Sequence, residues 1–268
     1  MNLAQKHILL TGATGGLGLA LALKLAEKNA VLGIVGRDTI KLGALKAQLA
    51  KLGCTAHCIL GDLSQQGASQ QIISDAKKAL GHIDILINNA GVLDFVELQN
   101  QSETRITEMV NTNVTALIQS TRALLPDFLN KNKGHFVFVG SIFGSLAFPH
   151  YATYCATKFA VHGFSQALRR ELVHTNIGVT YVAPRGIDTP MNDAKTAEMF
   201  KKTGNVMDSP EKVAGIIVNA LENEKEEVFI GGPQSLFAWL NGVCPKLVNL
   251  GLKKQTKIAL TYLKAPKT

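Results

Sequence analysis

The sequence lacks the cysteine and histidine arrangements that build metal sites and disulfide frameworks. Its four cysteines show no Cys-x-x-Cys spacing, and no cluster of histidines accompanies them. Cysteines without such spacing or partners are typical of reduced thiols in a cytosolic protein. We therefore expect no metal site, no disulfide bond and a cytoplasmic location. The cysteines are Cys54, Cys58, Cys155 and Cys244.

The patterns typical of a membrane-spanning segment and of a secretory leader do not occur in the sequence either. A spanning helix needs about eighteen or more consecutive apolar residues, and no such stretch occurs. No basic segment followed by an apolar one precedes the first apolar strand-like run at residues 6–11. We therefore expect neither a spanning helix nor a signal peptide.

Acidic residues are absent from the C-terminal part of the chain. None follows Glu227, whereas six lysines do, and the net charge of the whole chain is +8. Residues 1–227 therefore carry a net charge of only +2. A nucleic-acid-binding domain presents basic residues along a binding face. Because the positive charge here is confined to one end, we expect no nucleic-acid partner.

Apolar residues, by contrast, are abundant: they make up 46% of the sequence, against 18% charged residues. Short apolar runs alternate with longer amphipathic stretches, without a linker rich in Pro, Gly or Ser and without an internal repeat. Strands separated by helices predict right-handed crossovers and a parallel sheet covered on both faces. We predict one doubly wound α/β domain over residues 1–232, with a seven-stranded parallel sheet, and an extension over 233–268. The predicted strands are 6–11, 31–36, 55–60, 83–88, 134–140, 178–183 and 226–230, and the predicted helices are 16–29, 39–52, 67–80, 103–130, 152–174 and 210–222.

A glycine-rich turn, TGATGGLG at residues 11–18, joins the first predicted strand to the first predicted helix. Gly12 permits the tight turn, Gly16 lets the backbone approach a pyrophosphate, and Gly18 allows close packing of the helix on the sheet. The helix N-terminus then offers free N–H groups and the positive end of its dipole to the phosphates. The turn predicts a dinucleotide-binding site, the alternative being a loop that is merely flexible.

The spacing Thr-Gly-x-x-x-Gly-x-Gly resembles the pattern of the short-chain dehydrogenase/reductase family. Three further segments agree with that family in the right order: NNAG at 88–91, Ser141 thirteen residues before Tyr154-Cys155-Ala156-Thr157-Lys158, and PRGIDTP at 184–190. The resemblance covers roughly residues 5–232. It implies a Rossmann-type fold and an oxidoreductase that transfers a hydride between a nicotinamide cofactor and a carbonyl or alcohol. It also implies a homodimer or homotetramer, paired through the long helices 103–130 and 152–174.

Tyr154 and Lys158 lie four residues apart on a predicted helix, so both side chains project from one face. A free tyrosine has a pKa of about 10, and a nearby ammonium favours the phenolate and lowers that pKa. Ser141 can donate a hydrogen bond to a substrate carbonyl oxygen. In the family that the chain resembles, the lysine also binds the nicotinamide ribose, and an asparagine, here Asn113, helps hold a proton-relay water. The alternative is a non-catalytic NADP-binding regulatory module, which would have no need of these four residues.

The end of the second predicted strand, Gly36-Arg37-Asp38, favours NADP(H) over NAD(H). An NAD enzyme needs an acidic side chain here to accept from the adenosine ribose 2′-OH, and the family carries that acid at the position of Gly36. The Arg37 guanidinium can bind a 2′-phosphate in a bidentate manner, and the alternative is a solvated loop charge. Asp38 comes one residue too late and is better placed to cap the second helix, with Thr39 as the other candidate.

The resemblance assigns further cofactor contacts. Asp62 receives the adenine amino group, and Asn88 and Gly91 lie beneath the adenosine ribose. Ile187 and Thr189 clasp the nicotinamide carboxamide. The predicted cofactor-binding residues are Gly12, Thr14, Gly15, Gly16, Leu17, Gly18, Arg37, Asp62, Leu63, Asn88, Ala90, Gly91, Tyr154, Lys158, Pro184, Ile187 and Thr189.

One position departs from the family pattern, because Arg185 stands where the family usually has glycine. Either the backbone at 185 avoids a positive φ, or the arginine side chain faces the cleft or the solvent. The nicotinamide end of the site is less well defined for this reason.

The loop after Ser141 and a lid-like segment at 190–205 supply apolar residues for a substrate pocket. Such a lining suits a hydrophobic ketone, aldehyde or secondary alcohol, although the same residue types also occur in simple packing. Lid loops of this kind commonly close over the substrate. The predicted substrate contacts are Ser141, Phe143, Phe148, Tyr154 and Met191, and the further candidate lining residues are Leu146, His150, Met199 and Phe200.

The extension carries apolar residues over 234–252, interrupted by Pro245, and a further short helix at 254–263. Apolar positions flanked by lysines without acids suit an interfacial segment on anionic lipid. The alternative, which we prefer, is a C-terminal helix packed on the domain or on a partner subunit.

Overall fold

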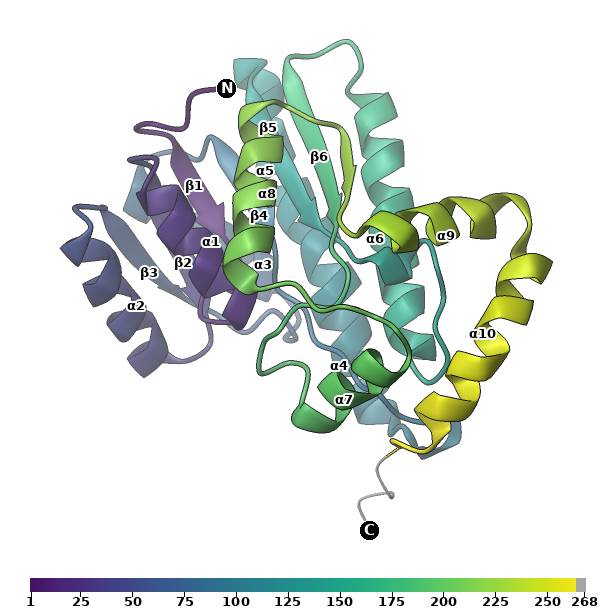
Figure 1. Cartoon of the computed structure of the whole chain (residues 1–268). Coiled ribbons are helices and arrows are strands. Elements are labelled where there is room, and N and C mark those ends of the chain that lie inside the picture. The colour runs from purple at the N-terminus through teal and green to yellow at the C-terminus, as the bar shows by residue number, and fades with distance from the viewer. Residues whose placement is uncertain (264–268) are drawn as a thin grey trace.

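The computed structural model describes residues 1–263, and of residues 233–235 it describes the backbone only. Seven strands form one sheet in the order β3-β2-β1-β4-β5-β6-β7, and every neighbouring pair is parallel. The predicted doubly wound α/β fold with seven parallel strands is confirmed (Figure 1). The strands are β1 (His7–Leu10), β2 (Val31–Gly36), β3 (Ala56–Leu60), β4 (Ile85–Asn88), β5 (Gly134–Val139), β6 (Ile177–Ala183) and β7 (Glu227–Phe229).

Helices cover both faces of the sheet because side chains alternate between the faces along each strand. In β1, Ile8 and Leu10 pack with the helices of one layer, whereas Leu9 packs with the helices of the other. Right-handed crossovers place successive helices on one face until the strand order reverses. The first layer is α1 (Gly16–Ala26), α2 (Thr39–Lys51) and α8 (Pro210–Glu222), and the second is α3 (Ala68–Leu80), α5 (Ala116–Lys131) and α6 (Ala152–Glu171).

The single helix predicted over 103–130 is interrupted. It consists of α4 (Glu103–Val110), a π-helical turn (Asn111–Thr115) and α5, after a 3-10 turn at Leu98–Asn100. In the π-turn the Ala116 N–H donates to the Asn111 carbonyl, five residues back. The apolar pattern runs through the interruption unchanged, so periodicity alone did not show it. Pairing of these helices and α6 between subunits stays a prediction.

The extension forms two helices, α9 (Gly232–Val243) and α10 (Pro245–Leu260), instead of the predicted short helix at 254–263. Pro245 begins α10 rather than breaking a helix, because a proline fits the first helical turn, where its missing N–H is not needed. Figure 1 shows α9 and α10 as an elbow beside α6, with α10 running towards α7 (Ala194–Lys202). Among the described residues, no helix is long and apolar enough to cross a bilayer.

Candidate active site

A cleft of about 820 Å³ lies beyond the carboxyl ends of the strands. It opens where β1 is flanked by β2 on one side and β4 on the other, so that successive crossovers run in opposite directions. Open α/β sheets bind ligands at this kind of switch point. The volume falls in the range of about 300–1,000 Å³ that is usual for small-molecule sites.

The glycine-rich turn forms one wall of this cleft. Gly12 has a φ of +63°, and a Cβ there would lie 2.8 Å from the Cα of Ala90, so only glycine fits. Helix α1 begins at Gly16, after Gly15, and neither a capping side chain nor an acidic residue occupies its described first turn. The first amide groups of α1 are therefore available to a phosphate, as predicted. Gly16 has a second role, because a Cβ there would lie 2.6 Å from Cγ2 of Thr189.

Basic side chains line the cleft at the end of β2. Arg37 is there as predicted, and Lys41 of α2 joins it. Asp38 caps α2, since its Oδ1 accepts from the N–H groups of Ile40 at 3.0 Å and Lys41 at 3.1 Å. The Asp38 carboxylate is thereby committed to the helix. The Arg37 side chain is 67% exposed and lies 3.9 Å from Oε1 of Glu108.

Asp62 and Leu63 line the cleft after β3. The Asp62 carboxylate accepts from the backbone N–H of Ser64 at 3.0 Å and from its hydroxyl at 2.8 Å. The Ser64 backbone hydrogen bond and, more weakly, the charge of Arg37 lower the pKa of Asp62. The carboxylate is therefore ionised at neutral pH and fixed in orientation.

The prediction that Asn88, at the end of β4, lies in the cofactor site is wrong. Asn88 is buried in the strand and does not line the cleft, whereas the next residue, Asn89, does. Nδ2 of Asn89 donates to the carbonyl oxygens of Thr11 at 3.0 Å and Gly12 at 3.3 Å, and so ties β4 to the glycine-rich turn. Strand alternation moves a side chain to the opposite face with a shift of one residue. The motif NNAG does not by itself say which asparagine faces the cleft.

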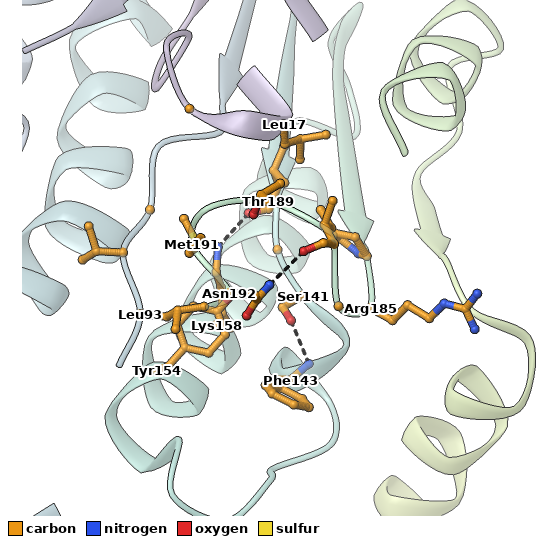
Figure 2. A pocket seen from close by; sticks show the side chains of 18 of the residues that line it. Leu17, Leu93, Ser141, Phe143, Tyr154, Lys158, Arg185, Thr189, Met191 and Asn192 are labelled. Atoms are coloured by element: carbon orange, nitrogen blue, oxygen red, sulfur yellow. Dashed lines mark hydrogen bonds between the residues drawn. The ribbon is translucent and has the colours of Figure 1, made fainter. Parts of the chain in front are cut away.

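Ser141, Tyr154 and Lys158 meet at the carboxyl end of β5 (Figure 2). Ser141 follows β5, and its Oγ accepts from the backbone N–H of Phe143 at 3.1 Å. Tyr154 and Lys158 come from one face of α6, as their spacing predicts. Nζ of Lys158 donates to the carbonyl oxygen of Val139 at 2.9 Å and lies 5.7 Å from the centroid of the Tyr154 ring.

Burial is the largest cause of the pKa shifts of Tyr154 and Lys158. It raises the pKa of Tyr154 to about 12, while the Ser141 hydroxyl acts in the opposite direction by hydrogen bonding to the tyrosine oxygen. Burial lowers the pKa of Lys158 to about 8, because a desolvated ammonium is disfavoured. The expected lowering of the Tyr154 pKa by Lys158 is thus contradicted for the chain alone. At neutral pH Tyr154 holds its proton, and it is set up as a proton donor.

The far end of the cleft is apolar. Phe143, Phe148 and Met191 line it as predicted, and so do Leu146 and Phe200. Met199 and His150 are not part of the lining: Met199, in α7 of the lid, is fully buried in the packing of the lid against the domain. The sequence did not identify the contribution of α9 and α10, because no local motif marks it. Their lining residues are Phe237, Val248, Gly251, Leu252 and Gln255.

The other predicted contacts also gather in the cleft. Of the seventeen residues assigned to the cofactor, only Asn88 does not line it. The residues not yet placed are Thr14, Leu17, Gly18, Gly91, Pro184 and Ile187, and all of them are lining residues.

Comparison with known proteins identifies the family. The family model for short chain dehydrogenases matches residues 6–199. The chain belongs to the short-chain dehydrogenase/reductase family, whose members are oxidoreductases. Mouse estradiol 17-beta-dehydrogenase 11 is 30% identical over 250 residues, which are 91% of this chain and 82% of that protein.

Two solved structures of this family are similar in fold. A short chain dehydrogenase from Burkholderia cenocepacia in complex with NADP has a TM-score of 0.78 and 26% identity, covering 88% of this chain and 100% of that one. A short chain dehydrogenase/reductase from Burkholderia phymatum in complex with NAD has a TM-score of 0.84 and 21% identity, covering 92% and 96%. Both of these neighbours hold a nicotinamide dinucleotide, NADP in one and NAD in the other.

Asn113 of the short-chain dehydrogenase/reductase set lies behind the cleft rather than on its wall. It is buried in the π-turn, and its Oδ1 accepts from the N–H of Val92 at 2.8 Å. Its Nδ2 donates to the carbonyl oxygen of Val92 at 2.8 Å and to Oγ1 of Thr157 at 3.1 Å. The side chain thus ties the segment after β4 to α6, next to the lysine.

Arg185, which stands where the family usually has glycine, avoids a positive φ, and it lines the cleft while its guanidinium is turned away from the reaction centre. Figure 2 shows Arg185 pointing away from Ser141 and Tyr154. Its Nε and Nη2 donate to the two carboxylate oxygens of Asp208 at 2.7 and 2.9 Å. The Asp208 side chain is only 3% exposed, and Lys212 approaches its Oδ1 at 2.7 Å. Hydrogen bonds from Arg185 are the largest cause of the lowered pKa of Asp208.

The Arg185–Asp208 ion pair lies where the two ends of the lid segment, residues 188–208, meet. The Asp188 N–H donates to the Asp208 carbonyl at 2.9 Å, and the Asp208 N–H donates to the Gly186 carbonyl at 2.9 Å. The segment between 188 and 208, which includes α7, is therefore a loop whose two ends are joined. Arg185 acts as a clamp on that junction, which we call the lid clamp (Arg185 and Asp208).

Proposed function

We propose that this short-chain dehydrogenase/reductase reduces an apolar ketone or aldehyde with NADPH and oxidises the corresponding secondary alcohol in the reverse direction. One observation carries the proposal. Ser141, Tyr154 and Lys158 meet in a single cleft that has a phosphate-binding turn at one end and apolar walls at the other. A regulatory module would need the turn but not the three residues.

The chain's own residues account for the proton and the phosphates. A bound nicotinamide dinucleotide supplies or accepts the hydride. Tyr154 holds a proton at neutral pH and gives it to the carbonyl oxygen, which Ser141 polarises with a second hydrogen bond. The Lys158 ammonium, charged below about pH 8, stabilises the phenolate that remains. We assign Asn113 a positioning role, through its bonds to Val92 and Thr157.

The NADP(H) preference rests on the cations at the end of β2. Arg37 and Lys41 both line the cleft there, Asp38 is occupied as a helix cap, and no carboxylate stands at Gly36. A Cβ at Gly36 would lie 3.2 Å from Oγ1 of Thr14, so an acidic side chain would also fit tightly. A 2′-phosphate would therefore meet two cations at this corner.

The apolar substrate rests on the lining of the far end, where aromatic and aliphatic side chains from the loop after Ser141, the lid and α9–α10 converge. A relative that is similar over most of the chain is named for estradiol, a compound of this apolar kind.

The first test is Tyr154→Phe, assayed by NADPH consumption with a panel of hydrophobic ketones and aldehydes. Loss of a positioned proton donor removes about 10²–10⁴-fold in rate. NADPH binding and the melting temperature should stay close to those of the unchanged chain. Undiminished turnover by the variant would refute the mechanism, and an unchanged chain that turns over none of the panel while binding NADPH would favour the regulatory module.

The second test compares kcat/KM for NADPH and NADH in Arg37→Ala and Lys41→Ala. A cation about 4 Å from a dianionic phosphate in a water-like medium contributes about 2 kcal/mol, or roughly 30-fold. Each substitution should reduce the preference by about that factor, acting on NADPH and not on NADH. Lys51→Ala, at the other end of α2, is the matched control. Equal losses with both cofactors would contradict the assignment.

A further inference from the structure

The elbow between α9 and α10 carries a row of large apolar side chains on its outer side. Leu236, Trp239 and Val243 follow a spacing of three and four residues along α9, which places them on one face. Leu247 and Leu250 continue the row on α10 with the same spacing. All five are more than half exposed, from 55% for Leu247 to 66% for Val243. We call these five residues the outer apolar face.

These residues are not needed to hold the elbow on the domain. The inner side of the same helices is already packed, with Ala238 and Val248 against Ile142 and Leu146 of the loop after β5. Ala259 packs near Met199 of the lid. Nδ2 of Asn241 donates to the Ser145 carbonyl at 3.0 Å. The two helices therefore have an apolar inner side, which faces the cleft, and an apolar outer side. Single exposed apolar residues are ordinary, whereas a contiguous group of this size marks an interaction surface.

Charge indicates what covers this surface. Lys246 lies beside Leu247, and Lys253, Lys254 and Lys257 follow along α10. None of these four forms an ion pair within residues 1–263, and no acidic residue is present after Glu227. Lys264 and Lys267, which lie outside the described residues, add to the same charge. A second copy packed symmetrically on this face would bring like charges together, whereas an anionic lipid surface would neutralise them.

We propose that the α9–α10 elbow is an interfacial membrane-binding surface, which lies on an anionic bilayer with the outer apolar face in the headgroup region. Tryptophan and leucine flanked by lysines are the residues that such segments use. Phe237, next to the outer apolar face, lines the cleft while 47% exposed. If the proposed function holds, the mouth of the cleft lies beside the lipid, so an apolar carbonyl compound dissolved in the bilayer can enter directly.

The test is co-sedimentation of the full chain with vesicles of phosphatidylcholine mixed with phosphatidylglycerol, and with vesicles of phosphatidylcholine alone, at low salt. The chain should bind the anionic vesicles. Trp239→Ser with Leu247→Ser should weaken binding by at least about tenfold, because two large apolar side chains are lost. Lys253→Gln with Lys254→Gln should weaken it by about 25-fold, at roughly fivefold for each lysine near the surface.

Matched controls replace exposed residues elsewhere. Ile40→Ser with Val173→Ser removes two apolar side chains that are 83% and 69% exposed, and it should leave vesicle binding unchanged. NADPH binding and melting temperature establish that each variant is folded. Tyr154→Phe should bind vesicles as tightly as the unchanged chain, so a failure of the catalytic proposal and a failure of this one can be told apart.

Three results would overturn the proposal. The first is no sedimentation of the full chain with anionic vesicles at low salt. The second is equal binding by the unchanged chain and by both elbow variants. The third is an unchanged chain that does not bind vesicles and is an oligomer by size exclusion with light scattering, which Trp239→Ser with Leu247→Ser converts to a monomer. That last result would assign the surface to a second copy of the chain.

Discussion

The lid clamp gives the sharpest test of the structure, because Arg185 is the residue that departs from the family pattern. Arg185→Met removes the guanidinium and keeps an aliphatic stem against Gly231, where an added Cβ would lie 2.8 Å from Cδ of Arg185. The Arg185 and Asp208 side chains are 16% and 3% exposed, so the change leaves a buried carboxylate with Lys212 as its remaining partner. The lid ends should then separate more often.

The expected size follows from the burial. Removing one partner of a buried ion pair costs about 3–5 kcal/mol, and Lys212 retains part of that, which leaves about 2–3 kcal/mol. At about 1.4 kcal/mol for each factor of ten, the open lid becomes roughly 30- to 150-fold more populated. Because the loss is local, it should appear in the segment 188–208 before it appears in the melting temperature of the whole domain.

Native-state hydrogen exchange, read by peptide, measures this opening directly. Arg185→Met and Asp208→Asn should each accelerate exchange across 188–208 by that factor, and the double variant should add little to either. Lys212→Met is the matched control, since that side chain is 58% exposed and contributes at most about 1 kcal/mol. Exchange in Arg185→Met equal to that of the unchanged chain would refute the clamp, and so would an additive double variant.

Two further predictions concern the proton path. The Tyr181 hydroxyl donates to the Ser141 carbonyl at 3.3 Å. Tyr181→Phe should therefore loosen Ser141 and lower kcat about three- to tenfold, with NADPH binding unchanged. An equal loss in NADPH affinity would contradict a role through Ser141. The raised pKa of Tyr154, about 12, means that the phenolate needed for alcohol oxidation increases tenfold per pH unit, whereas the phenol needed for carbonyl reduction stays saturated. The rate of oxidation should therefore rise with pH between about 6 and 7.5, which is below the titration of Lys158 near 8, while the rate of reduction stays flat. The measurement is the pH profile of kcat in each direction. The same slope in both directions would contradict the assignment.

The sequence predicted those parts of the molecule that depend on local spacing. The alternation of strands and helices gave the sheet, since a parallel sheet buried on both faces needs apolar strands joined by crossovers. Tyr154 and Lys158 could be paired from four-residue spacing, and Asp38 could be recognised as a cap, because both are properties of a single helix.

The errors arose where a position is decided by contacts distant in sequence. Asn88 and Asn89 are adjacent, and only the bonds of Asn89 to the glycine-rich turn show which one faces the cleft. The partner of Arg185 lies 23 residues further along the chain, so no local pattern could identify it. The pKa of Tyr154 was predicted in the wrong direction because the lysine is visible in the sequence while the burial is not.

The strand order has a consequence for how this protein can be changed. Every cation proposed for the 2′-phosphate comes from the chain before β4, and every wall of the apolar end comes from the chain after it. Within the sheet, the two halves join along the line between β1 and β4, where Asn89 holds the glycine-rich turn. We therefore expect cofactor choice and substrate choice to be separately adjustable, and we expect a chimera joined within β4 to exchange one of them while keeping the other.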